Sequence, residues 1–315
     1  MRAMMYRSYG GPEVLEITEL PRPTPSAGQV LVKVAAASVN PVDWKIASGK
    51  LRPIASAHLP QVPGFDVAGE VAEVGPGVTT FVAGQRVHAR VTGRGCATCA
   101  EYALAGVDVT APMPAGLDVG EAAGLPLAGM SALQGLRDQA GMPLTGARQR
   151  VLVVGASGGV GHLAVQIARA AGATVVGVCS GRNAALVRSL GAQEVLDYTQ
   201  PDPYRGQAPF DIVLDCVGGS PSPWLPLLTP TGHFASTLPG PSVLLHAALN
   251  PVRGRKVHAV MLKATAADLG ALDQLVEAGA LRVVIDSRFP LEALAEAWRR
   301  SMSARAVGKI VIDVG

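Results

Sequence analysis

The chain has 315 residues, of which 49% are hydrophobic and 16% charged, which excludes a disordered protein and allows two domains. Its net charge of +3, with no lysine- and arginine-rich run, gives no basic footprint of the kind that nucleic-acid-binding proteins show. No apolar stretch reaches the roughly 18 residues of a membrane helix, and the N-terminus lacks a signal-peptide core, so we predict a cytoplasmic protein. In that compartment the four cysteines are expected to be reduced thiols: Cys96, Cys99, Cys179 and Cys216.

The first hundred residues are predicted to be rich in β-strands. Short apolar segments recur between Gly and Pro residues, which is typical of a barrel or sandwich. The predicted strands cover residues 29–35, 66–74, 85–89 and 101–104.

From residue 118 the pattern changes to alternating helices and strands. Asp118 can cap a helix, and Asn183 can cap a second, short one. The predicted strands cover residues 151–154, 174–178, 210–217 and 256–262, and a helix covers 161–171. This alternation predicts an α/β fold with a doubly wound parallel sheet.

The last fifty residues are predicted to return to the first domain. They contain a predicted helix at 267–278, a strand at 283–286, a helix around Trp298 and a strand at 309–312.

A glycine-rich segment follows the strand at 151–154 and opens the helix at 161–171. Such a turn lets the backbone approach a pyrophosphate, which the helix N-terminus also attracts. The alternative is a tight turn that binds no ligand. The predicted cofactor contacts are Ala156, Ser157, Gly158, Gly159, Val160 and Gly161, with Ala156, Gly158 and Gly161 in the three positions of the dinucleotide fingerprint.

The end of the second strand of this domain favours NADPH. NAD enzymes usually carry an Asp or Glu there, whereas neither residue occurs from His162 to Gln193. Ser180 and Arg182 can donate hydrogen bonds to a 2′-phosphate instead, although Arg182 could simply decorate a helix start. Tyr198 is predicted to lie near the adenosine, or to be a structural strand residue.

Five segments resemble the medium-chain dehydrogenase/reductase superfamily, in particular its zinc-free, zeta-crystallin-like quinone oxidoreductase branch. They are residues 38–45, 63–69, 125–132, the glycine-rich loop at 155–161 and residues 308–311. The resemblance implies a Rossmann NADPH-binding domain at 119–265, inserted in a GroES-like, mostly β substrate domain formed by residues 1–118 and 266–315. It also implies a quinone or a conjugated carbonyl as substrate, and it suggests a homodimer.

Zinc enzymes of this superfamily take metal ligands from a Cys and from a Gly-His-Glu motif. The corresponding regions here hold Asn40 with Asp43, and Gly64-Phe65-Asp66. Because phenylalanine cannot bind a metal, the catalytic zinc set is expected to be absent. Cys96 and Cys99 could form a redox-active pair or half a metal site, but two ordinary loop residues are the favoured interpretation.

The first of these regions supplies the predicted catalytic residues. The resemblance places Asn40 near the nicotinamide ribose and the substrate, whereas an Asn before Pro could also simply shape a turn. Asp43 and Lys45 are expected to pair in the cleft or in solvent, and Trp44 to line the substrate pocket or the core.

Four further residues are predicted to contact the cofactor. Ser131 stands where the family commonly has a cofactor-binding Thr. Cys216 and Val217 follow a buried strand at the carboxyl edge of the sheet, where ligands bind in such folds. Lys309 is expected near the cofactor phosphates or at the surface.

These features together predict an NADPH-dependent reductase of quinones or α,β-unsaturated carbonyls that transfers hydride without zinc. A conjugated acceptor suits a site without a Lewis acid, because its own conjugation accepts the hydride. The alternatives are a specialised enoyl reductase of a biosynthetic pathway and a non-catalytic NADPH-binding sensor. We expect no nucleic-acid partner.

Overall fold

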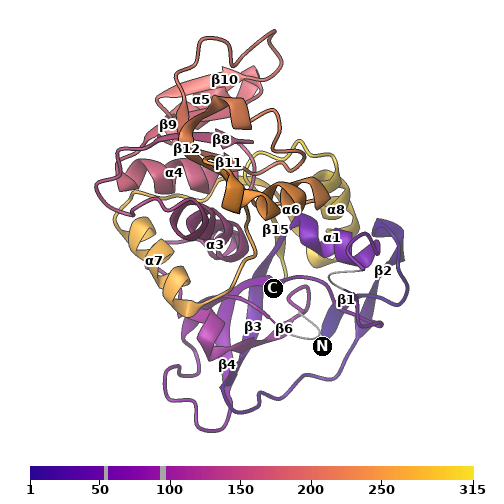
Figure 1. Ribbon diagram of the computed structural model, residues 1–315. Coiled ribbons are helices and arrows are strands. Elements are labelled where there is room, and N and C mark those ends of the chain that lie inside the picture. The colour runs from indigo at the N-terminus through magenta and orange to yellow at the C-terminus, as the bar shows by residue number, and fades with distance from the viewer. Residues whose placement is uncertain (53–55, 93–96) are drawn as a thin grey trace. The chain divides into compact units, whose positions relative to one another are not determined.

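The computed structural model describes residues 1–52, 56–92 and 97–315 (Figure 1). The chain forms two compact units. Unit 1 consists of Met1–Leu127, Ala264–Glu277 and Val283–Gly315, and unit 2 of Ala128–Lys263 and Ala278–Arg282.

Unit 1 is organised around one long strand, β3 (Gln29–Val39), which is antiparallel to three neighbours. Hydrophobic and polar residues alternate little along β3, because both of its faces are covered and most of its side chains are buried. The other strands of this mixed sheet are β4 (Asp66–Val74), β5 (Arg86–Arg90), β6 (Tyr102–Gly106), β7 (Thr110–Pro112), β14 (Ile285–Pro290) and β15 (Lys309–Asp313). A separate hairpin-like pair joins β1 (Arg2–Tyr6) to β2 (Leu15–Glu19).

The C-terminal tail returns to this unit, as predicted. Strand β15 pairs with β3, with Ile310 opposite Val39. Strand β14 begins at Ile285 rather than at the predicted Val283, because its partner β15 begins only at Lys309, directly after the left-handed Gly308 with φ of 85°. Nothing on β15 is therefore available to pair with Val283.

The described part of unit 1 contains the α-helices α1 (Pro41–Ala47), α2 (Val119–Gly124), α7 (Ala266–Glu277) and α8 (Leu294–Met302). Asp118 caps α2 as predicted, since its carboxylate accepts hydrogen bonds from the N–H groups of Gly120 and Glu121. Helix α8 buries Trp298 in the same core as Ile46, Ile310 and Ile312.

Unit 2 is a six-stranded parallel sheet in the order β10-β9-β8-β11-β12-β13. Numbered within the unit, this order is 3-2-1-4-5-6, which is the Rossmann arrangement and confirms the predicted fold class. The strands are β8 (Arg150–Val154), β9 (Thr174–Cys179), β10 (Glu194–Asp197), β11 (Phe210–Asp215), β12 (Leu228–Ser236) and β13 (Lys256–Ala259).

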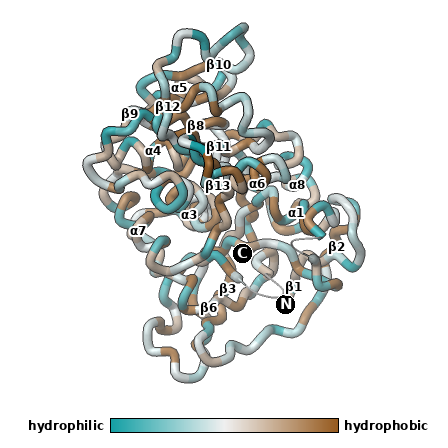
Figure 2. Tube along the Cα trace, in the orientation of Figure 1, coloured by the Kyte–Doolittle hydropathy of each residue, from teal (hydrophilic) through white to brown (hydrophobic). Residues whose placement is uncertain are grey.

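The helices of unit 2 are α3 (Pro126–Gln134, which starts on the last two residues of unit 1), α4 (Gly161–Ala171), α5 (Ala184–Ser189) and α6 (Pro241–Ala248). Helix α4 lies along β8 and β9 (Figure 1). Figure 2 shows strongly hydrophobic chain along β8 and β11, where Leu152 and Phe210 form part of the core together with Phe234 of β12. No helix in the described part of the chain is long and apolar enough to cross a membrane.

Replacing Trp298 by alanine is expected to lower the free energy of unfolding by about 3–5 kcal/mol, because the side chain is 0% exposed and leaves a cavity. Urea unfolding monitored by circular dichroism would measure the loss. Met302→Ala is the matched control on the same helix, since Met302 is 42% exposed. Equal losses in the two variants would contradict this placement of Trp298.

Candidate functional site

In unit 2 the glycine-rich loop runs from the end of β8 into α4, as predicted. Gly155 adopts φ of 76°, which favours glycine, and a Cβ on Gly161 would lie 2.1 Å from the Gly155 carbonyl oxygen. Ala156 is buried, and its N–H donates to the carbonyl of Val178 on the next strand. The loop therefore leaves no room for a side chain at residue 161, and it opens the eleven-residue helix α4. A tight glycine loop at a helix N-terminus fits a pyrophosphate.

The turn after β9 contains the residues that are predicted to determine the preference for NADPH over NADH. Ser180 and Arg182 both lie on it, and no ion pair of Arg182 is found in the described part of the chain. Asn183 forms no capping hydrogen bond, contrary to the prediction; its Nδ2 instead donates to Ser157 Oγ at 3.0 Å. This bond ties the turn to the glycine-rich loop, a contact that the sequence pattern did not indicate.

Tyr198 lies beside this turn, because strands β9 and β10 end together. Its N–H donates to the carbonyl of Cys179 at 3.2 Å, and its side chain is 60% exposed. Its predicted role near an adenosine remains a prediction. Asp197, the preceding residue, also faces the turn. It was not predicted, because an acidic residue was expected only at the end of the second strand.

The loop after β11 is shaped by a buried carboxylate. Asp215 accepts hydrogen bonds from the N–H groups of Val217 and Gly218, at 2.9 and 3.0 Å from Oδ1. The chain therefore turns at Asp215, two residues before the predicted end of the strand. Val217 is exposed and Cys216 is partly buried; burial raises the pKa of the Cys216 thiol, which disfavours the reactive thiolate. Ser131 is buried on α3.

In unit 1 a buried polar cluster is centred on Asp66, the first residue of β4. Its Oδ2 accepts hydrogen bonds from Asn40 Nδ2 at 2.8 Å and from Ser38 Oγ at 2.9 Å, and its Oδ1 accepts one from the N–H of Leu127 at 3.0 Å. Lys309 Nζ lies 3.9 Å from Asp66 Oδ2 and donates to Asn40 Oδ1 at 2.6 Å. We refer to Ser38, Asn40, Asp43, Asp66 and Lys309 as the Asp66 cluster; each side chain is almost fully buried.

Lys309 thus holds the amide of Asn40, and its predicted contact with cofactor phosphates remains a prediction. Both atoms of that amide are engaged, so its orientation is fixed by chemistry: the nitrogen faces a carboxylate and the oxygen faces an ammonium. Among the described residues, Asn40 Nδ2 donates only to Asp66, so one of its N–H groups has no partner there. Burial raises the pKa of Asp66, and it lowers the pKa of Lys309, although the two charges oppose both shifts.

Asp43 lies in the same buried region. Its Oδ2 accepts the Asn40 backbone N–H at 2.6 Å, while its Oδ1 has no hydrogen-bond partner among the described residues. Burial, with a further contribution from the charge of Asp66, raises the pKa of Asp43 to about 7. Asp43 and Lys45 form no ion pair in the described part of unit 1, because the carboxyl is directed into the cluster.

Trp44 and Lys45 on α1 are both partly buried, and Trp44 packs against the hydrophobic core of unit 1. Trp44 Nε1 donates to Ser301 Oγ at 3.1 Å, and Lys45 Nζ lies 5.5 Å from the centre of the Trp44 ring. Burial, and then the charge of Lys50, lower the pKa of Lys45. Their predicted catalytic roles are not tested by these contacts.

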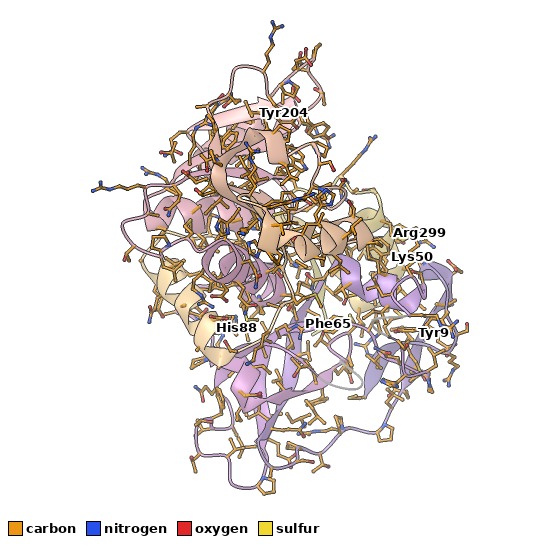
Figure 3. The ribbon with its side chains drawn as sticks, viewed as in Figure 1. Tyr9, Lys50, Phe65, His88, Tyr204 and Arg299 are labelled. Carbon is orange, nitrogen blue, oxygen red and sulfur yellow. The ribbon has the colours of Figure 1, made fainter. Side chains whose placement is uncertain are left out.

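The position of the missing zinc-ligand histidine is occupied by Phe65. Its ring, labelled in Figure 3, lies 5.0 Å from Cζ of Arg90. Among the described residues, no three His, Cys, Asp or Glu side chains are arranged to hold a metal ion. Cys96 lies outside the described residues, and burial raises the pKa of the Cys99 thiol well above its usual value.

Two family models match the chain: the alcohol dehydrogenase GroES-like domain over residues 26–134 and the zinc-binding dehydrogenase model over residues 190–312. The chain is 41% identical to the chloroplast envelope quinone oxidoreductase homolog of Arabidopsis thaliana, over 99% of this chain and 98% of the relative. It is 33% identical to the chloroplastic NADPH-dependent alkenal/one oxidoreductase of the same plant, over 99% of this chain and 79% of the relative. The solved structure of the quinone oxidoreductase from Coxiella burnetii matches with a TM-score of 0.90 and 32% identity, over 100% of this chain and 99% of that one.

The chain therefore belongs to the medium-chain dehydrogenase/reductase superfamily, in its quinone-oxidoreductase branch. It is an oxidoreductase with a fold that binds nicotinamide cofactors.

The raised pKa of Asp43 makes a prediction about stability. Between the ordinary value of 3.8 and about 7, the folded chain keeps a proton that the unfolded chain has lost, so this group lowers the free energy of unfolding as the pH rises through that window. Asp43→Asn removes the effect, and Asn Oδ1 can still accept the Asn40 N–H. When the pH is raised from 5 to 8, the free energy of unfolding of the variant should therefore increase by about 2–3 kcal/mol relative to that of the unsubstituted protein.

Urea unfolding at both pH values measures this difference. Asp108→Asn, which changes an exposed carboxylate of the same unit, should leave the difference between pH values unchanged. If the free energy of unfolding changes with pH by the same amount in Asp43→Asn and in the unsubstituted protein, Asp43 does not titrate in this range.

Proposed function

We propose that this protein is an NADPH-dependent reductase of quinones or α,β-unsaturated carbonyls that works without zinc. The observation that carries the proposal is the 2.6 Å hydrogen bond from Lys309 Nζ to Asn40 Oδ1. This bond occupies the amide oxygen of Asn40, so the side chain can offer other groups only its N–H donors. A substrate carbonyl oxygen requires such a donor.

The residues that would hold the cofactor are those of unit 2. The loop from Gly155 to Gly161 would bind the pyrophosphate, Ser180 and Arg182 the 2′-phosphate, and Tyr198 would lie near the adenosine. When bound, NADPH supplies the hydride that the acceptor takes up.

Asn40 would act on the substrate oxygen. The ammonium of Lys309 draws electron density from the amide oxygen, which makes the remaining N–H a stronger donor. Asp66 fixes the amide against rotation through its bond to Nδ2. A conjugated acceptor needs only this modest polarisation, whereas an isolated ketone needs a stronger one, from a Lewis acid or a general acid.

Three features support the absence of a zinc requirement. Phe65 offers no ligand atom, and Asn40 already has both of its amide atoms engaged within the Asp66 cluster. Asp66 likewise uses both of its oxygens. The expected cytoplasmic location and the suggested homodimer stay predictions.

The test is the oxidation of NADPH and NADH at 340 nm by purified protein, with a panel of quinones and enones, with and without a chelator. Acceptor-dependent oxidation of NADPH that the chelator does not affect would support the proposal. Loss of activity with the chelator would contradict the zinc-free mechanism. NADPH binding without turnover of any acceptor would favour a sensor instead.

Lys309→Met is expected to lower kcat with enones by roughly ten- to a hundredfold, because Asn40 loses the charge that orients and polarises it. Lys309→Arg should retain more activity, since it keeps a cation in place. The loss should be smaller for quinones, which accept hydride more readily. Thermal melting of each variant shows whether it folds, and Asp66→Asn/Lys309→Met removes the unpaired buried charge that the single variant leaves. Equal losses for all acceptors would contradict a role of Lys309 in polarising the substrate.

Arg182→Ala is expected to raise KM for NADPH about tenfold or more and leave KM for NADH unchanged, because a charge-assisted hydrogen bond to the 2′-phosphate is lost. Initial rates with both cofactors measure the change. Arg188→Ala, on the following helix, is the control. A parallel rise for both cofactors would show that Arg182 does not recognise the 2′-phosphate.

A further inference from the structure

A carboxylate lies at the same turn as Ser180 and Arg182. Asp197 is the last residue of β10, and it stands in register with Cys179, the last residue of β9. The two strand ends are also joined by the hydrogen bond from the Tyr198 N–H to the Cys179 carbonyl. Asp197 therefore belongs to the edge of the sheet where the turn after β9 begins.

The Asp197 side chain is held in one position against the turn. Its Oδ1 accepts hydrogen bonds from the N–H of Thr199 at 3.0 Å and from Thr199 Oγ1 at 2.8 Å. Its Oδ2 lies against the backbone of Gly181, where an added Cβ would be only 2.5 Å away. A side chain at residue 181 would thus displace the carboxylate, so glycine is what lets Asp197 reach the turn.

Asp197 carries its charge at neutral pH. Hydrogen bonds from Thr199, and also the N–H of Gly181, lower the pKa of this carboxyl. No ion pair of Asp197 is found in the described part of unit 2, so no cation neutralises it directly.

A carboxylate in this place opposes the binding of a 2′-phosphate. The phosphate carries close to two negative charges and would sit on the turn next to Asp197, where it also competes for the Gly181 N–H. A ribose with a free 2′-hydroxyl meets no such repulsion and can donate a hydrogen bond to a carboxylate. Arg182 acts in the opposite sense, so the turn carries one charge that favours the 2′-phosphate and one that opposes it.

We propose that Asp197 is a specificity-determining residue, which reduces the preference for 2′-phosphorylated nucleotides so that the protein accepts NADH as well as NADPH. The inference rests on the proposed function, because it assumes that the Ser180–Arg182 turn receives the adenosine ribose. It places the discriminating acid at the end of the third strand of unit 2 instead of the second.

Calorimetric titration of the full chain with 2′,5′-ADP and with 5′-AMP tests the inference without requiring turnover. Asp197→Asn should bind 2′,5′-ADP about three- to tenfold more tightly, since a unit charge roughly 6 Å from a dianion in water costs about a factor of ten. Affinity for 5′-AMP should stay the same or fall. The Asn Oδ1 can still accept from Thr199, and melting curves check that the variant is folded.

Asp202→Asn is the matched control. It removes one negative charge nearby in the chain, and asparagine suits the φ of 47° at this residue. This control should leave both affinities unchanged, whereas a gain equal to that of Asp197→Asn would mean that net charge alone is responsible and would overturn the inference.

The remaining outcomes separate the two proposals. If the unsubstituted protein reduces an acceptor but Asp197→Asn leaves the ratio of the two affinities unchanged, the inference is wrong and the proposed function stands. If the ratio shifts as expected but no acceptor is reduced, the inference stands and the reductase proposal is wrong. If neither nucleotide binds at millimolar concentration, both are overturned.

Discussion

The buried carboxylate of Asp66 is the constraint on which the rest of unit 1 depends. A carboxylate removed from water is destabilising by several kcal/mol unless hydrogen bonds and an opposite charge replace its hydration. Asp66 obtains them from three segments that are distant in the sequence: Ser38 and Asn40 around the end of β3, Leu127 at the start of α3 and Lys309 on β15. Those segments can satisfy the carboxylate only in one arrangement, so the charge specifies how they meet.

The same arrangement sets the chemistry that Asn40 can perform. An unconstrained asparagine presents either its oxygen or its nitrogen, whereas this one is held by groups that distinguish the two atoms. Asp43 is the member of the cluster whose desolvation is not fully compensated by hydrogen bonds, because its Oδ1 is buried without a partner among the described residues. A stable core would not need such a group, which is why polar atoms of this kind gather at functional sites rather than elsewhere.

The Rossmann sheet and the glycine-rich loop could be predicted from the sequence because their signals are local. A strand, a turn and a helix within residues 150–171 carry the whole pattern, and helix α4 has the predicted bounds. The Asp66 cluster could not be predicted in this way, since Asn40 and Lys309 are 269 positions apart and meet only because β15 pairs with β3. Asp197 was missed for the same reason: its position against Gly181 follows from the register of β10 on β9.

The charged groups of the Asp66 cluster in unit 1 are buried, whereas those at the turn of unit 2 are at least partly exposed to water. Charges therefore act with different strength at the two places. In the Asp66 cluster water is excluded, so each charge acts strongly on its neighbours and the geometry is rigid. At the turn of unit 2, Arg182 is exposed and Asp197 is only partly covered, so water and salt weaken both charges. Weak opposing charges shift a preference between two cofactors by small factors without blocking either one. A single substitution at the turn can therefore change the choice of nucleotide, whereas a substitution of Asp66 or Lys309 alone leaves a buried charge without its partner and disturbs the position of Asn40.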